Sequence, residues 1–370
     1  MKLTFIKALL PILFFAQLAL AEGVVNFYNW ADYIGESTIR DFEEEYGIKV
    51  NYDQYDSSEI VEAKLLAGNS GYDLVVHSSM YSKRLMPLKI FHEIDPLKLS
   101  NYELLDPMLM EMLDEIDSGN RIMIPYSYGS TGVSYDANKI FARDPNPPIG
   151  SAAMLYEPDT LSKFSDCGII MLDSPTDVIP QALVYLGYDD SSKDPIELDE
   201  AEELLHGARP FIKKFTSSTL LNDLANGDAC IAMSWAGDYA TAKDRAEAAG
   251  KDIDLRYFVP EEGGLLWVDI IVIPKDAKNL ENAYLLLDYL LRPEVSADFV
   301  NLTHYASPVP DAKEFIKEEI FSDPAVYPTP EIMGRLFFTE VDPPKYSRIK
   351  TRIFSRFTTG IKKERKNDRE

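Results

Sequence analysis

The sequence predicts a two-domain α/β protein, and three observations support this prediction. Residues 24–76 alternate strand-like and helix-like segments, and residues 169–234 repeat the alternation. At about 150 residues per domain, a chain of 370 residues is too long for one small core. Its 46% hydrophobic and 26% charged residues are typical of a globular protein. We therefore expect α/β units, each a mainly parallel sheet flanked by helices.

The N-terminal segments justify the first of these units. Strands are expected over 24–28, 48–55 and 72–76, and helices over 37–46 and 57–67, with Gly47 and Gly68 as stop signals. Strands joined through helices form a parallel sheet with right-handed crossovers. Ligands of such sheets bind beyond the carboxyl ends of the strands. Residues 29–33 and 77–79 lie there.

The middle of the chain repeats the pattern. Strands are expected over 169–172 and 229–234, and helices over 178–186 and 199–215, the latter interrupted by Gly207 and Pro210. A further strand over 265–273 places Trp267 and Asp269 two residues apart, on one face. A helix follows over 282–291, and the charged tail 362–370 is expected to be disordered.

Residues 1–21 have the features of a cleavable signal peptide. Lys2 and Lys7 are followed by an apolar run over 8–20, which ends in a small-residue cleavage pattern at 19–21. The alternative is a membrane anchor, but the run falls short of the roughly 20 residues that span a bilayer. In an exported chain, the two cysteines, Cys167 and Cys230, are expected to form a disulfide.

The composition and the motifs argue against several classes of function. A formal net charge of −24 disfavours nucleic acid and anionic lipid, and favours cationic partners. No phosphate loop, GxSxG, HExxH or CxxC is present, and the four histidines are scattered. We therefore expect neither an enzyme nor a metal site nor a cofactor.

Aromatic and acidic residues gather at the predicted strand ends. The set consists of Trp30, Asp32, Tyr33, Ser78, Asp177, Trp235, Asp238, Trp267 and Asp269. Carboxylates accept strong charge-assisted hydrogen bonds from ammonium groups, and aromatic faces attract cations. This combination suits an organic cation. Each residue also has an ordinary structural interpretation, because tryptophans usually pack in cores and an aspartate after a strand is often a helix cap.

These residues lie in motifs that resemble those of the periplasmic polyamine-binding receptors of ABC importers. The motifs are YNWADYI at 28–34, GYDLVVHSS at 71–79, IPYSYGSTGVSYD at 124–136, NDLANGDACIAMSWAGDYA at 222–240, EGGLLWVDIIVIPKDAKN at 262–279 and LLRPEV at 290–295. The resemblance extends over nearly the whole chain after the signal peptide. It implies a type II periplasmic binding protein fold, with a ligand in the cleft between two lobes.

The resemblance also implies the ligand residues and the division into lobes. The ligand residues of the family fall on the nine residues above and on Tyr305. Lobe 1 is expected to comprise residues 22–132 and about 262–310, and lobe 2 residues 133–261. Residues 311–361 are expected to form a helical segment that packs on the lobes. The implied role is that of a periplasmic, monomeric receptor that carries a polyamine to the permease of an importer.

Some positions differ from the family pattern and bear on the ligand. Ala31 replaces a hydroxyl residue, His77 a proline and Asp177 a glutamate. Trp267 resembles the spermidine type, whereas Asp32 and WAGD at 235–238 resemble the putrescine type. Because Asp238 adds a carboxylate, putrescine is favoured over spermidine.

Three other functions are alternatives to transport. A sensor that presents its ligand state to a membrane signalling protein would have the same soluble chain. A ferric-ion receptor needs clustered tyrosinates or a histidine–carboxylate set, and the motifs supply tryptophans instead. An extracellular enzyme needs a nucleophile–base pair, and none is visible.

Overall fold

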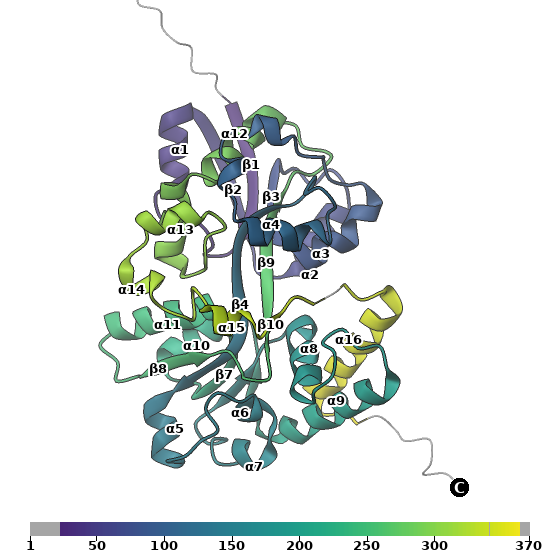
Figure 1. The fold of residues 1–370 in the computed structure, drawn as a ribbon, viewed down its shortest axis with the longest axis vertical. Helices are drawn as coiled ribbons and strands as arrows, with labels where there is room; N and C mark the ends of the chain where they lie inside the picture. Colours follow the sequence, from purple (N-terminus) through teal and green to yellow (C-terminus); the bar gives the residue numbers. More distant parts are fainter. Residues whose placement is uncertain (1–22, 340, 363–370) are drawn as a thin grey trace, which may run out of the picture.

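The computed structural model describes residues 23–339 and 341–362. The expected signal peptide, and the charged tail beyond residue 362, lie outside the described residues. Figure 1 shows two lobes stacked along the long axis, with β4 and β9 extending between them. Within the described residues, no helix combines the length and the apolar character needed to cross a bilayer.

Strands of both lobes join in one mixed sheet, in the order β2-β1-β3-β9-β4-β7-β5-β6, with β10 on β9 and β8 on β4. The strands are β1 Gly23–Trp30, β2 Ile48–Tyr55, β3 Leu74–Ser78, β4 Ile124–Asp136, β5 Ile169–Met171, β6 Lys214–Phe215, β7 Ile231–Trp235, β8 Leu255–Phe258, β9 Gly264–Val272 and β10 Leu336–Phe337. The β1–β3 and β5–β7 groups pair in parallel. Strand β4 is antiparallel to β7, β8 and β9, and β9 is also antiparallel to β3.

Helices cover the sheet in each lobe (Figure 1). Those of the upper lobe are α1 Thr38–Tyr46, α2 Ser58–Leu66, α3 Ser79–Leu85, α4 Pro107–Asp114, α12 Leu280–Leu290 and α13 Pro293–Thr303. Those of the lower lobe are α5 Ala137–Arg143, α6 Ala153–Tyr156, α7 Pro158–Leu161, α8 Pro175–Tyr185, α9 Pro195–Ala208, α10 Leu220–Asn226 and α11 Ala236–Ala248. The C-terminal part adds α14 Glu318–Phe321, α15 Pro330–Met333 and α16 Pro344–Thr359.

Local sequence signals explain the ends of several helices. As expected, α1 ends at Gly47, which adopts a left-handed φ of 64°. The Ser57 side chain caps α2 by accepting a hydrogen bond from the backbone N–H of Ile60. Helix α8 begins at Pro175, three residues before the expected start, so Asp177 lies in its first turn.

The expected helix over 199–215 was wrong at its C-terminal end. Helix α9 ends at Ala208 and a 3₁₀ turn follows at Arg209–Phe211. Pro210 cannot donate a helical backbone hydrogen bond. The chain then turns to form β6, which pairs in parallel with β5.

The C-terminal part is not helical throughout. It contributes β10, where Leu336 and Phe337 pair in parallel with Gly264 and Leu265 of β9. Helix α16 then packs on α8 and α9 of the lower lobe. This part of the chain therefore contacts both a strand that joins the lobes and the helices of the lower lobe.

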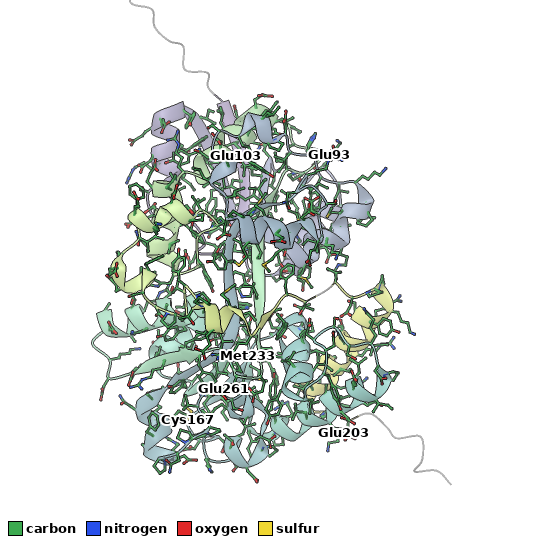
Figure 2. The ribbon with its side chains drawn as sticks, viewed as in Figure 1. Glu93, Glu103, Cys167, Glu203, Met233 and Glu261 are labelled. Atoms are coloured by element: carbon green, nitrogen blue, oxygen red, sulfur yellow. A yellow bond between two sulfur atoms is a disulfide. The ribbon has the colours of Figure 1, made fainter. Side chains whose placement is uncertain are left out.

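Side chains fill the interior of both lobes (Figure 2), where Met233 is buried in the lower lobe, while Glu93 and Glu103 are exposed on the upper lobe. Apolar residues of the parallel strands, including Phe27, Leu74 and Ile231, are fully buried. Burial at about 25 cal/mol per Å² of apolar surface is the main contribution to folding. These buried apolar side chains therefore hold the strands of both lobes in place.

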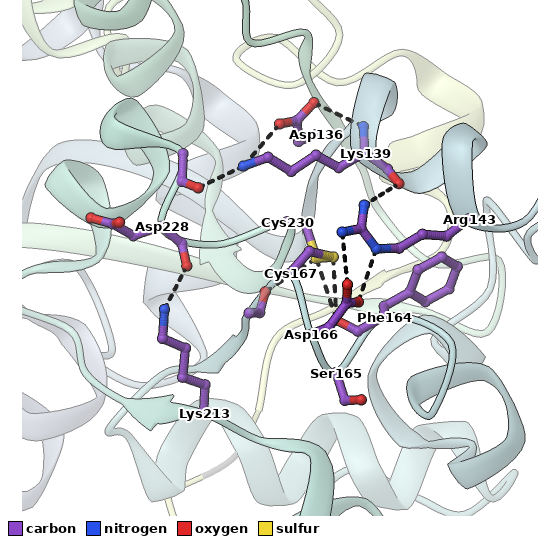
Figure 3. The surroundings of a disulfide bond; sticks show 12 residues. Asp136, Lys139, Arg143, Phe164, Ser165, Asp166, Cys167, Lys213, Asp228 and Cys230 are labelled. Atoms are coloured by element: carbon purple, nitrogen blue, oxygen red, sulfur yellow. Dashed lines mark hydrogen bonds and ion pairs between the residues drawn. A yellow bond between two sulfur atoms is a disulfide. The ribbon is translucent and has the colours of Figure 1, made fainter.

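The expected disulfide is confirmed. Cys167 and Cys230 are bonded, with 5.5 Å between their Cα atoms and a sequence separation of 63. Figure 3 shows the bond beside the Arg143–Asp166 ion pair, in which two guanidinium nitrogens each lie 2.9 Å from a carboxylate oxygen. The bond ties the start of β7 to the loop that precedes β5.

Candidate functional site

Strand β9 carries the centre of the site. In the sheet register, Asp269 lies opposite Ser78 of β3 on one side and Ser127 of β4 on the other. Directly opposed residues of antiparallel strands have Cβ atoms about 5 Å apart on one face. Two hydroxyl side chains therefore flank the Asp269 carboxyl.

Trp267 lies on the same face of β9, opposite Gly129 of β4. A Cβ atom at Gly129 would lie only 2.5 Å from Cζ2 of the Trp267 ring. The absence of a side chain at Gly129 therefore lets the indole lie against the strand. Its ring also meets the Tyr305 ring edge to face, with centroids 5.3 Å apart.

The electrostatics of Asp269 are set by its burial. The residue is 9% exposed. Removal from water raises the pKa of its carboxyl to about 7, and the nearby Tyr33 hydroxyl lowers it only in part. The pKa of Tyr33 is in turn raised well above its usual value, first by burial and then by the charge of Asp269. A cationic partner would therefore stabilise the ionised form of Asp269 near neutral pH.

A second carboxyl, Asp238, comes from the first turn of α11 in the lower lobe. The Tyr305 hydroxyl of the upper lobe donates a hydrogen bond of 2.7 Å to it. Burial raises the pKa of Asp238 to about 6, while this bond and the charge of Arg245 lower it. The Tyr305 ring also lies 5.3 Å from the Tyr33 ring. Ring contacts among Trp267, Tyr305 and Tyr33 thus extend from Asp238 of α11 toward Asp269 of β9.

Asp177 is buried and fully engaged by the lower lobe and by β4. Its Oδ1 accepts hydrogen bonds from the Thr131 hydroxyl at 2.6 Å and from the Trp235 indole N–H at 3.2 Å. Its Oδ2 accepts one from the Ser174 hydroxyl. Burial raises the pKa of Asp177, and these three donors oppose the rise.

Trp30 and Asp32 lie at the end of β1. The Trp30 ring packs on Tyr55, with centroids 4.4 Å apart. Asp32 has a left-handed φ of 55°. Its side chain is 82% exposed, and a carboxylate oxygen lies 3.9 Å from an Arg245 nitrogen. Asp32 therefore occupies the solvent-exposed edge and not the buried interior.

The structure thus brings together Tyr33, Ser78, Asp238, Trp267, Asp269 and Tyr305 around one interior face. It pairs Asp177 with Trp235 beside this face. Sequence reasoning missed Ser127, Gly129 and Thr131, which alternate along one face of β4. The signal was weak because these residues are small and uncharged, and because all 13 residues of β4 are buried, so that burial does not distinguish one face of the strand from the other.

The Trp267 indole N–H and the Ser127 hydroxyl, on the two strands that pair at Asp269, are buried and have no hydrogen-bond partner. The Trp30 indole N–H at the end of β1 is likewise buried without a partner. Most buried polar groups are paired. Among the described residues, no ion pair involves Asp177, Asp238 or Asp269, and Arg245 pairs instead with Asp32. The interior face therefore has the carboxyls and hydroxyls of a cation site, with no cationic side chain of the described chain paired to them.

Comparisons with known proteins identify the family of the chain. Residues 37–329 match the family model described as bacterial extracellular solute-binding protein. The chain is 39% identical over 338 residues to the putrescine-binding periplasmic protein SpuD of Pseudomonas aeruginosa, covering 91% of this chain and 92% of the relative. It is 38% identical over 345 residues to the putrescine-binding periplasmic protein PotF of Escherichia coli, covering 93% of both.

Solved structures show the same fold. The spermidine/putrescine ABC transporter substrate-binding protein PotD of Streptococcus pneumoniae superposes with a TM-score of 0.77 at 28% identity. The match covers 92% of this chain and 100% of that one. The relatives are binding proteins and not enzymes, as expected from the sequence. The two-lobed α/β fold and the match over most of its length show that this chain belongs to the bacterial extracellular solute-binding protein family.

Proposed function

We propose that this chain is a periplasmic receptor that captures a protonated polyamine, putrescine in preference to spermidine, and delivers it to the permease of an ABC importer. One observation carries the proposal: two carboxyls that face the interior, the buried Asp269 and the half-buried Asp238, have raised pKa values and form no ion pair with a described side chain. A buried charge without a partner is costly. An ammonium group at each carboxyl would remove that cost.

The aromatic rings suit the rest of such a ligand. Trp267 and Tyr305 offer ring faces and edges on which methylene groups can pack. A ring face also attracts a cation by about 0.5–2 kcal/mol. A diamine, with one charge at each end of an apolar chain, matches this order of carboxyl, ring and carboxyl.

The two lobes would close around this ligand. We assign residues 22–132 and about 262–310 to lobe 1, and residues 133–261 to lobe 2. Under this assignment, the hydrogen bond from Tyr305 to Asp238 joins the lobes across the site. Ligand held by both carboxyls would favour the closed form that an importer can recognise. We also expect the receptor to act as a monomer.

Two further observations favour putrescine. The two relatives at 39% and 38% identity are both named as putrescine-binding. Asp238 supplies a second carboxyl, half-buried, for a short diamine, whereas Asp32 is exposed at the edge. Nothing in the fold or the relatives favours the sensing alternative.

Isothermal titration calorimetry with putrescine, cadaverine, spermidine and spermine tests the proposal. We expect saturable binding at one site per chain, tightest for putrescine. Neutral 1-butanol, which has the same carbon chain length without the charges, is the control and should not bind. Failure of all four polyamines to bind the folded protein would overturn the proposal.

A further inference from the structure

We infer that Asp177 does not hold an ammonium group of the ligand but fixes the Trp235 ring, which makes Asp177 a positioning residue of the site. This inference rests on the proposed function, because it concerns which carboxyls contact the diamine. It departs from the sequence-based expectation that Asp177 is a ligand residue.

The hydrogen bonds of Asp177 are the first argument. A carboxylate offers about four acceptor positions. Oδ1 already accepts from Thr131 and Trp235, and Oδ2 accepts from Ser174. The side chain is buried, with 6% exposure. Its acceptor capacity is therefore largely used by groups of the protein.

The three indole N–H groups differ in a way that supports this role. Those of Trp30 and Trp267 have no partner, whereas that of Trp235 is held by Asp177. Trp235 is the last residue of β7 and lies opposite Thr131 of β4. Thr131 donates to the same carboxylate oxygen as the indole. The register of β7 on β4 fixes the backbone of Trp235, and Oδ1 of Asp177 bridges its indole to the Thr131 hydroxyl. The Trp235 ring is therefore preorganised for contact with a ligand.

The spacing along β4 is the second argument. Ser127 lies opposite Asp269, and Thr131 binds Asp177 four residues further on. An antiparallel strand rises about 3.4 Å per residue, which separates these two backbone positions by roughly 14 Å. An extended putrescine spans only roughly 6 Å between its nitrogens by standard bond lengths. A short diamine held by Asp269 therefore reaches Asp238, which Tyr305 brings near, more readily than Asp177.

The decisive variants are Asp177→Asn and Asp177→Ala. In Asp177→Asn the amide oxygen can still accept from Thr131 and Trp235, while the amide nitrogen can donate to the Ser174 hydroxyl. Only the charge is lost, and we expect putrescine affinity to fall less than roughly threefold. Asp177→Ala releases the indole, and we expect a loss of roughly tenfold or more. Near-ultraviolet circular dichroism of the ligand-free protein should change in Asp177→Ala and be preserved in Asp177→Asn.

A ligand comparison separates positioning from charge pairing. n-Butylamine has one ammonium group on the same carbon chain as putrescine. If Asp177 only positions Trp235, each variant weakens both ligands by the same factor. A loss of roughly 30-fold or more for putrescine in Asp177→Asn, with a smaller loss for n-butylamine, would show a charge anchor and overturn the inference. The wild-type titration separately decides the proposed function, because it does not depend on Asp177.

Discussion

Replacing Asp269 by asparagine should stabilise the ligand-free protein and weaken ligand binding. Burial raises the pKa of this carboxyl from 3.8 to about 7. The folded protein therefore holds a proton that the unfolded chain releases above about pH 4. For this group, folding stability is lost as pH rises from about 4 to about 7, and the shift corresponds to about 4 kcal/mol. Asparagine has nearly the same shape as aspartate but does not titrate, so the variant does not lose this stability as the pH rises.

The expected stability difference depends on pH. At pH 8 the variant should be more stable than wild type, and the difference should shrink by about 2–3 kcal/mol at pH 5. Chemical denaturation of both ligand-free proteins at the two pH values measures this. Asp311→Asn, which removes one charge at an exposed position, is the matched control and should show no comparable pH-dependent difference.

The effect on binding has the opposite sign. At pH 8 Asp269 is ionised, and removing one partner of a buried charge pair costs about 2–5 kcal/mol of affinity. Calorimetric titration with putrescine at pH 8 measures this loss. Unchanged affinity together with a less stable ligand-free variant at pH 8 would show that Asp269 is a structural residue, and would refute the argument.

Three other predictions follow from the same geometry. Putrescine affinity should rise from pH 5 to pH 8, and binding below pH 7 should release protons, because the carboxyls of Asp238 and Asp269 have pKa values of about 6 and about 7. Calorimetry in buffers of different ionisation enthalpy measures the released protons. An affinity that does not change with pH would contradict the prediction. Reduction of the Cys167–Cys230 bond, which closes a loop of 63 residues, should lower the free energy of unfolding by about 4 kcal/mol in denaturant titrations, whereas an equal midpoint with and without reductant would contradict the prediction. Gly129→Ala should displace the Trp267 ring and reduce putrescine affinity by roughly tenfold or more, and native affinity in this variant would show that the ring does not contact the ligand.

Much of the fold could be predicted from local signals. Alternating strand and helix patterns located the parallel units, because each pattern repeats over a few residues and depends on the chain's own periodicity. The same logic placed Trp267 and Asp269 on one face of β9, since side chains alternate along a strand. Stop signals such as Gly47 also worked, because a left-handed residue ends a helix whatever its surroundings.

The arrangement of the site depended on contacts between distant segments. The Tyr305–Asp238 hydrogen bond joins residues 67 positions apart, and the Thr131–Asp177 bond joins residues 46 apart. No local periodicity encodes such pairings, and Asp32 and Asp177 looked alike as aspartates near strand ends. Only the folded chain leaves Asp32 exposed at the edge and surrounds Asp177 with three donors.

The sequence by itself determined the α/β class, the disulfide partners and the position of Trp267 and Asp269 on one face of a strand. Those features follow from composition, from the presence of only two cysteines and from short-range periodicity. Tertiary structure alone decided that Ser78 and Ser127 flank Asp269, and that Gly129 makes room for Trp267. It also raised the pKa values of Asp177, Asp238 and Asp269, because burial and the resulting loss of hydration depend on the packing of distant segments around them.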